Sequence, residues 1–228
     1  MGPEATVATQ PVFYLFIAFT ILLVLGYCWG RRRNVRIYRQ AFEELIAIFD
    51  PRDRQFTNIG GLTGYHAKLF PKGRGTITRV DATITLLPRQ ALLYYPVSRI
   101  LRGFDRLFIT LHLKEGLAAG MDEAHLIEKR YAGFKGPKIT NQERLRCEEA
   151  DWGGMEFFLY SGSGRAARQL RRLLSQSGLP GTIRHIALVP EQEKVFVFMI
   201  PRTASVSRTM PKLLSWVNEQ LRSGAVGT

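Results

Sequence analysis

The strongest constraint on this chain is an uncharged apolar run near its N-terminus. From Pro11 to Gly30 the sequence reads PVFYLFIAFTILLVLGYCWG. A helix of this length spans about 30 Å, the thickness of the hydrocarbon core of a bilayer. Tyr14 lies near one end of the run and Trp29 near the other, where aromatic side chains commonly meet the membrane–water interface. The run therefore predicts a transmembrane helix over residues 11–30.

The charges around this run predict its orientation and disfavour a cleaved signal peptide. A signal peptide carries its basic region before the apolar stretch and a small-residue cleavage site after it. Here no such cleavage site is evident, and the basic residues come after the run: Arg31, Arg32, Arg33, Arg36 and Arg39. By the positive-inside rule we expect residues 31–228 in the cytoplasm and residues 1–10 outside.

The composition indicates a folded, basic domain after the membrane helix. The chain has 228 residues and is 46% hydrophobic, which is enough for one domain with a hydrophobic core. The 32 Lys and Arg residues exceed the 19 Asp and Glu residues, so the net charge is +13, a balance typical of proteins that bind nucleic acid or anionic lipid. Cys28 and Cys147 are too few for a disulfide framework and fit no metal-ligand spacing.

Hydrophobic periodicity predicts the elements of that domain. Helical spacing continues through a basic juxtamembrane helix over 31–51, and residues 52–61 read as a loop. Strands are predicted at 64–70, 76–86, 107–113, 155–160, 182–189 and 194–200, and helices at 89–102 with a break at Pro96, at 164–176, and at 209–221 with Pro211 near the start. Residues 114–153 are charged and contain several glycines, which predicts a surface insertion with a short helix at 122–131.

These elements predict an α+β fold. We expect a mixed or antiparallel sheet with helices packed on one face, plus the N-terminal transmembrane helix. The cytoplasmic α+β domain would cover residues 62–221 with its insertion at 114–153, and residues 222–228 would form a tail.

The segment SGSGRAARQLRRLL, residues 161–174, resembles a phosphate-binding turn because it formally fits G-x-G-x-x-A between a strand and a helix. Two requirements of a dinucleotide site fail. The next strand ends without an acidic residue, since Glu191 lies in a hairpin turn, and too little chain follows for a doubly wound sheet. The segment also lacks the Lys-Ser/Thr ending of a P-loop.

A helical wheel of the same segment predicts an amphipathic helix. One side collects Ala166, Ala167, Leu170, Leu173 and Leu174, and the other collects Arg165, Arg168 and Arg172 with Arg171 on the flank. The arginines could form a solvated face or a surface for an anionic partner, and the high net charge keeps both interpretations open.

No constellation in the sequence indicates an active site. The histidines His66, His112, His125 and His185 are scattered without metal-ligand spacing, and His112 and His185 are expected to be structural. The sequence therefore predicts a non-enzyme with no cofactor and no metal. The predicted sites are anionic-surface contacts at the nine arginines of 31–39 and 165–172.

In the order of its elements, the chain resembles the calumin family, the coiled-coil-domain subunit of the PAT complex in the multipass translocon. The similarity covers roughly residues 12–221. It includes the stretch GRGTITRVDATITLLPRQALLYYPVSRILRGFDRLFITLHL over 73–113 and the small-residue turn into a basic helix over 155–174. Gly136-Pro137-Lys138-Ile139 is similar to a family tetrapeptide at a different place in the order, and the strand ending in Met199-Ile200-Pro201 with the last helix completes the match.

The resemblance implies a ribosome- and translocon-associated factor in membrane-protein insertion and folding. Its partners would be the ribosome through rRNA, the Sec translocon, an Oxa-family insertase and nascent membrane proteins. The chain departs from the family in lacking a long acidic segment before the membrane helix and a long charged helical tail. Such a minimal version suggests a prokaryote, an archaeon, where the membrane would be the cell membrane; in a eukaryote it would be the endoplasmic reticulum.

Two alternatives remain beside this expectation. The first is a membrane-anchored scaffold whose arginines bind anionic lipid head groups. The second is a nucleotide-dependent enzyme that uses the glycine-rich turn over 161–167.

Overall fold

A computed structural model of the chain describes residues 10–73, 75–114, 122–132, 139, 142–177 and 181–225. Nearly all of the N-terminal segment 1–10 and most of the family-like tetrapeptide 136–139 therefore lie outside the described residues. The last described residue, Ala225, lies inside the predicted tail over 222–228 and belongs to the last helix.

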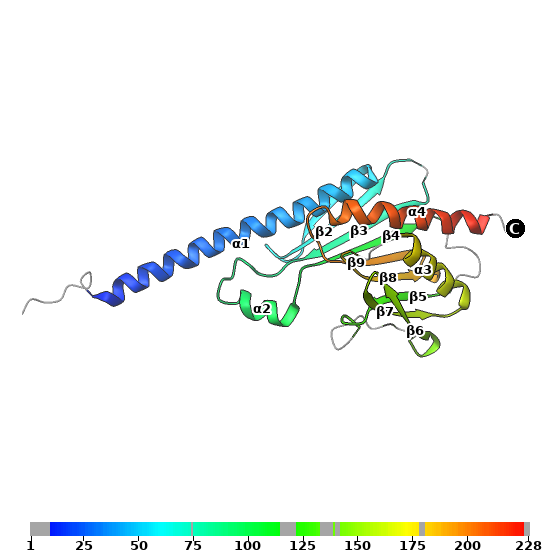
Figure 1. The fold of residues 1–228 in the computed structure, drawn as a ribbon. Helices are drawn as coiled ribbons and strands as arrows, with labels where there is room; N and C mark the ends of the chain where they lie inside the picture. Colours follow the sequence, from blue (N-terminus) through cyan, green and yellow to red (C-terminus); the bar gives the residue numbers. More distant parts are fainter. Residues whose placement is uncertain are drawn as a thin grey trace, which may run out of the picture.

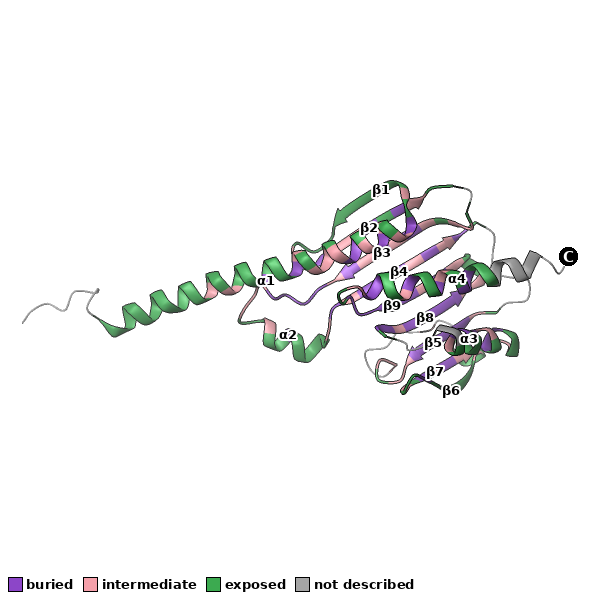
Figure 2. Ribbon diagram, turned by 45° about the horizontal axis from the view of Figure 1, so that its top comes forward, coloured by how far each residue is buried: buried purple, intermediate pink, exposed green. Residues whose placement is uncertain are grey.

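One uninterrupted helix, α1 (Pro11–Phe49), contains both the predicted transmembrane helix and the predicted juxtamembrane helix. It ends where expected, because Asp50 adopts a left-handed conformation with φ 37° and donates its N–H to the Ile46 carbonyl. Side chains of the first half are mostly exposed, whereas Ala41, Leu45 and other residues of the second half are buried (Figure 2). The second half is therefore part of the domain, and the first half projects from it (Figure 1).

The domain is built on a nine-stranded sheet in the order β1-β2-β3-β4-β9-β8-β5-β7-β6. The strands are β1 (Pro51–Asn58), β2 (Gly64–Pro71), β3 (Ile77–Thr85), β4 (Arg106–Leu113), β5 (Ala124–Glu128), β6 (Arg146–Trp152), β7 (Met155–Ser161), β8 (Ile183–Val189) and β9 (Lys194–Met199). All neighbouring strands pair antiparallel. The predicted α+β class with an antiparallel sheet is confirmed.

A layer of helices covers one face of this sheet. It consists of the second half of α1, α3 (Gly164–Ser177) and α4 (Ser205–Ala225), with α4 between the other two (Figure 1). The core forms between the layers, where the inward side chains of the strands, such as Val80, Ile109 and Val197, meet Leu45, Leu170 and other helix residues. The fourth helix, α2 (Tyr95–Arg102), lies outside this layer, beside the middle of α1.

The prediction of a loop over 52–61 was wrong, because residues up to Asn58 form the edge strand β1. Every residue of β1 after its first is exposed, so the strand shows no apolar alternation, and it is held by backbone pairing to β2. The domain accordingly begins before residue 62.

The prediction of a surface insertion over 114–153, with a helix at 122–131, was also wrong. The strand β5 lies between β7 and β8 with four consecutive buried residues, and a short run buried on both faces carries no strand-like alternation. The other missed strand, β6, is an edge strand whose charged residues are exposed.

Two helices have different bounds from those predicted. Residues 89–94 form turns, and α2 begins only at Tyr95, so Pro96 lies in a first turn rather than at a kink. The last helix begins at Ser205, four residues before the predicted start, and Pro211 lies inside it.

Candidate functional site

The nine predicted arginines do not form one surface. On α1, Arg32, Arg33 and Arg36 line one cleft, whereas Arg39 lines a different groove beside Tyr38 and Phe42. Burial and then the neighbouring Tyr38 raise the pKa of Tyr65, and Arg31 lies close enough for its charge to oppose that rise. Helical rotation thus divides the juxtamembrane cluster between two faces.

The cleft lined by the α1 arginines has a volume of about 840 Å³ and lies between α1, α2 and the loop after β9. Arg99 of α2 and Arg202 of that loop bring two further cations to it. Trp29 stands at its edge, with the Arg33 guanidinium 5.4 Å from the centre of the indole ring. The carboxylate of Asp105 also lines this cleft, and it is bound to Arg89. The cleft therefore carries a strong positive potential, suited to phosphate groups.

A buried polar network closes the cleft at its base. Arg89 donates two hydrogen bonds to the Asp105 carboxylate, at 2.9 and 2.7 Å, and a third to Asn34 Oδ1 at 2.9 Å. The Asn34 amide in turn donates to the carbonyls of Leu62 and Leu87. Asn34 is fully buried, so α1 is joined to the loops around the sheet by a desolvated, charged network.

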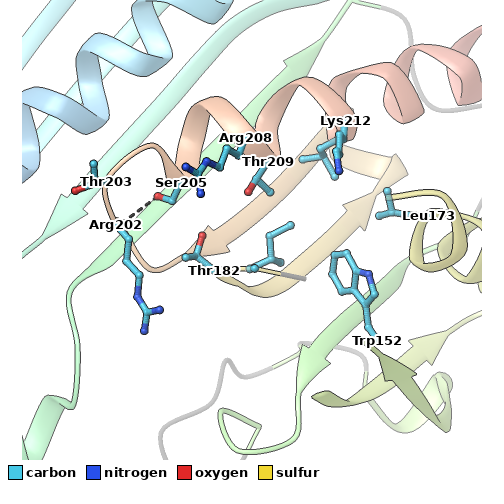
Figure 3. Close-up of a pocket in the computed structure, with 12 residues that line it drawn as sticks. Trp152, Leu173, Thr182, Arg202, Thr203, Ser205, Arg208, Thr209 and Lys212 are labelled. Atoms are coloured by element: carbon cyan, nitrogen blue, oxygen red, sulfur yellow. Dashed lines mark hydrogen bonds between the residues drawn. The ribbon is translucent and has the colours of Figure 1, made fainter. Parts of the chain in front are cut away.

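A second cavity of about 530 Å³ has Arg202 in its lining as well and lies between the first turns of α4 and the start of β8 (Figure 3). Arg208 and Lys212 project from α4 beside it, and Trp152 lies on the opposite side. The two cavities share Arg202 and Thr203, so the basic lining runs from the end of the apolar half of α1 onto α4.

The start of α4 already holds an anionic group. Glu44 of α1 accepts hydrogen bonds from the backbone N–H groups of Ala204, at 3.0 Å, and Ser207, at 2.9 Å. A carboxylate at this position satisfies the orphan donors and the positive end of the helix dipole. The helix start is therefore a joint between α1 and α4 rather than an open anion site.

The arginines of α3 are exposed as the helical wheel predicts, and the leucines and alanines of the opposite side pack on the sheet. Two of them meet acidic side chains: Arg171 lies 2.6 Å from Glu148, and Arg172 lies 3.8 Å from Glu219. Arg165 and Arg168 are exposed near the start of the helix. The charge of this face is thus partly neutralised by neighbouring strands and helices.

The glycine-rich turn before α3 has no parallel sheet around it. The strands β7 and β8 run in the same direction but are separated by β5, which pairs antiparallel with both. Ser163 Oγ accepts a 3.4 Å hydrogen bond from the Ala166 N–H, as an N-cap residue does. This geometry is that of a tight strand-to-helix connection, and it lacks the crevice between adjacent parallel strands where dinucleotides bind.

Two predicted structural histidines are in strands as expected, and one has an unpredicted partner. His112 lies 2.7 Å from Asp81. His185 is buried on β8, where its Nε2 lies 3.2 Å from Nδ1 of His125 on β5, and His125 lies 2.9 Å from Glu123. Burial lowers the pKa of His185 to about 3, and the charge of the neighbouring His125 contributes to this shift to a smaller extent. The His185 imidazole is therefore neutral.

Within the described ranges, His, Cys, Asp and Glu form no group that could hold a metal ion.

Several residues of the basic cleft could not be predicted from the sequence. Arg99 and Arg202 are isolated cations in segments of unremarkable composition, and only the closeness of α2, α1 and the loop after β9 makes them neighbours of Arg36.

In comparisons with known proteins, no family model and no curated protein sequence matches the chain.

Proposed function

We propose that this chain is a single-pass membrane protein whose cytoplasmic domain binds an anionic macromolecule, and that it acts as a ribosome- and translocon-associated factor in membrane-protein insertion and folding. In this proposal the protein is an adaptor without catalytic activity. Its partners are rRNA of the ribosome, the Sec translocon, an Oxa-family insertase and nascent membrane proteins.

The apolar half of α1 supports the membrane part of the proposal. The helix is long and apolar enough to cross a bilayer, and none of its most apolar window is buried within the chain. A signal sequence passes the same test, but Gly26 and Gly30 lie against Leu92 and the backbone of Arg89. Because the folded domain packs on the end of the apolar run, a retained anchor explains the structure better than a cleaved leader does.

The basic surface of the helix layer is the single observation that carries the ribosome part. A row of basic residues runs from α1 to α4 and consists of Arg36, Arg202, Arg208 and Lys212. The exposed arginines of α3 extend the positive charge to the far side of the layer. Contacts between such a surface and rRNA are dominated by phosphate and weaken as salt rises. The resemblance to the calumin family favours this partner among anionic polymers.

The test is co-sedimentation of full-length protein in nanodiscs with salt-washed ribosomes, at low and high salt. We expect binding at low salt that is lost at high salt. Two charge-reversal triples, Arg165→Glu/Arg168→Glu/Arg172→Glu and Arg202→Glu/Arg208→Glu/Lys212→Glu, should each reduce binding at least tenfold. Absence of binding at low salt would overturn the ribosome proposal.

The control triple is Arg52→Glu/Lys68→Glu/Arg130→Glu. It makes the same change in net charge at exposed positions on β1, on β2 and in the turn after β5, none of which lines the basic cleft, the second cavity or the groove beside Arg39. We expect it to retain most of the binding. Equal loss with all three triples would indicate that net charge, and not the helix layer, determines binding.

Anionic lipid is a second candidate ligand, and the position of the 840 Å³ cleft favours it. Arg32 and Arg33 directly follow the apolar run, so the cleft would open at the level of the lipid head groups. Detergent-solubilised protein should then be stabilised against heat by phosphatidylglycerol more than by phosphatidylcholine. Arg32→Gln/Arg36→Gln should remove that difference, whereas Arg52→Gln/Arg54→Gln should keep it.

A further inference from the structure

The segment around α2 exposes large apolar side chains in a pattern that the soluble part of a protein rarely shows. Leu93, Tyr94, Val97, Ile100 and Leu101 are between 48% and 81% exposed. Their spacing follows one face of a helix, and Ser98, at the edge of that face, is fully buried. Among the described residues after Arg31, the other exposed large apolar side chains are Phe56 and Ile59. An apolar patch of this kind marks a contact with a partner or a membrane.

The structure holds this segment against the end of the apolar run of α1. A β-carbon at Gly26 would lie 2.9 Å from Leu92 Cδ2, and one at Gly30 would overlap the Arg89 backbone. The clash at Gly30 is with backbone, so the helix needs glycine there for the segment to approach, whereas at Gly26 the contact is with the end of the Leu92 side chain. Because Gly26 precedes Gly30 by four residues, Leu92 lies about 6 Å inside the apolar run.

Both ends of the segment are tied down by the buried network described above. Arg89 precedes α2 and Asp105 follows it, and the two form a doubly hydrogen-bonded ion pair. The Leu87 N–H also donates to Asp105, at 2.8 Å. The α2 segment is therefore a loop closed at its base, held beside α1 at a defined height along the helix.

The charges of the segment match an anionic surface. Residues 86–104 contain no acidic residue, and Arg99 and Arg102 lie in the last turn of α2. At 100° per residue these arginines fall on the side of the helix opposite Val97, Ile100 and Leu101. A helix with one apolar face and basic residues on its other side is typical of the boundary between acyl chains and head groups.

We propose that residues 92–102 form a second membrane contact, in which the apolar face of α2 inserts into the cytoplasmic leaflet beside α1 and Arg99 and Arg102 bind anionic head groups. The occupant of this apolar face is lipid, because the face lies beside the apolar run of α1, whose large side chains are mostly exposed from Val12 to Trp29. An insertion depth of about 6 Å agrees with the 5–10 Å typical of interfacial helices. The inference rests on the membrane span of the proposed function and does not depend on ribosome binding.

The test uses full-length protein reconstituted into phosphatidylcholine–phosphatidylglycerol vesicles. In a Cys28→Ser/Cys147→Ser background, Ile100→Cys is labelled with an environment-sensitive fluorophore and quenched with lipids brominated near the head-group end of the acyl chain. Ile100 is 81% exposed, so labelling there leaves the fold intact. We expect several-fold stronger quenching by brominated lipid than for Phe56→Cys, an exposed apolar position on β1. Equal quenching of both labels by aqueous iodide would overturn the inference.

Two controls separate the other outcomes. The label at Leu22→Cys, an exposed position within the apolar run, reports the span itself. Lipid quenching at Leu22 without quenching at Ile100 would overturn only this inference, whereas no lipid quenching at Leu22 would overturn the membrane anchor as well. Protection of the Ile100 label that disappears on dilution with excess lipid would show that a second copy covers the face, which also overturns the inference.

Charge dependence provides an independent measurement. Arg99→Gln/Arg102→Gln should keep the fold and reduce the extra quenching that phosphatidylglycerol gives over pure phosphatidylcholine. The matched change Arg52→Gln/Arg54→Gln on β1 should leave that extra quenching unchanged. An identical lipid dependence in wild type and the Arg99/Arg102 variant would overturn the role of these two arginines.

Discussion

Arg89 donates a 2.9 Å hydrogen bond to Asn34 across 55 residues of sequence, and in doing so it joins α1 to the loop that carries α2. The same guanidinium neutralises Asp105, and the side chains of both charged residues are less than 10% exposed. Removing one partner of such a buried ion pair is costly, because the charge of the other partner is then neither paired nor solvated.

Replacing Arg89 should therefore destabilise the protein strongly. We expect Arg89→Met to lower the free energy of unfolding by about 3–5 kcal/mol, since it leaves the Asp105 carboxylate buried without its cation. Urea unfolding of the full-length protein in detergent micelles, followed by tryptophan fluorescence, measures this change. Lys72→Met breaks the exposed pair with Asp50 and should cost less than about 1 kcal/mol. A similar cost for both variants would contradict the importance of burial.

Gly30→Ala should be destabilising, although the same change within a helix normally stabilises it by up to about 1 kcal/mol. The added methyl group would overlap the Arg89 backbone and force α1 and the loop apart, at a cost of about 1–3 kcal/mol. Thermal unfolding in micelles is the measurement. The methyl group added by Gly75→Ala would meet no atom within 4 Å, and the φ angle there lies outside the left-handed region. The free energy of unfolding of this variant should stay within about 0.5 kcal/mol of wild type. A neutral or stabilising Gly30→Ala would show that the two segments do not pack as described.

Acid should weaken the fold through His185. Its pKa is lowered to about 3 in the folded state, from 6.5, so the unfolded chain binds a proton below pH 6.5 that the folded chain does not bind. The stability from the neutral imidazole is thus complete above pH 6.5 and is lost as pH falls toward 3, with a slope of up to about 1.4 kcal/mol per pH unit. Urea unfolding across this range should show a shallower slope for His185→Gln than for wild type. An unchanged slope would mean that another group determines the acid sensitivity.

The cap that Glu44 provides for α4 predicts an asymmetry between neighbouring glutamates. Glu44→Ala removes the acceptor for two backbone N–H groups and should cost about 1–2 kcal/mol. Glu43→Ala changes an exposed side chain on the same helix and should be close to neutral. Chemical unfolding of the two variants side by side tests the difference. Equal effects would indicate that helix propensity, and not the cap, determines stability here.

The sequence predicts well those helices and strands that bury one face and expose the other. The strand with Val80, Ala82 and Ile84 and the helix with Leu170 and Leu173 each bury one face and expose the other, and both were predicted within a few residues. The strands β1, β5 and β6 were missed because they lie at an edge or are buried on both faces, where periodicity carries no signal.

The candidate site is predicted only in part, for a related reason. Arg32, Arg33 and Arg36 are noticeable because they are adjacent in sequence. Arg99 and Arg202 become their neighbours only through the packing of distant segments on α1, which no local pattern encodes. The network of Asn34, Arg89 and Asp105 is hidden in the same way, since each residue alone is an ordinary polar side chain.

The continuity of α1 has a mechanical consequence in the proposed membrane setting. A helix without a break at the interface behaves as a rigid rod. It therefore transmits both the rotation and the tilt of its membrane-spanning half to the attached domain. Each residue of an α-helix turns the chain by about 100° and advances it by about 1.5 Å. The number of residues between Gly30 and Leu45, where α1 packs on the core, therefore determines which face of the domain points toward neighbouring proteins in the plane of the bilayer.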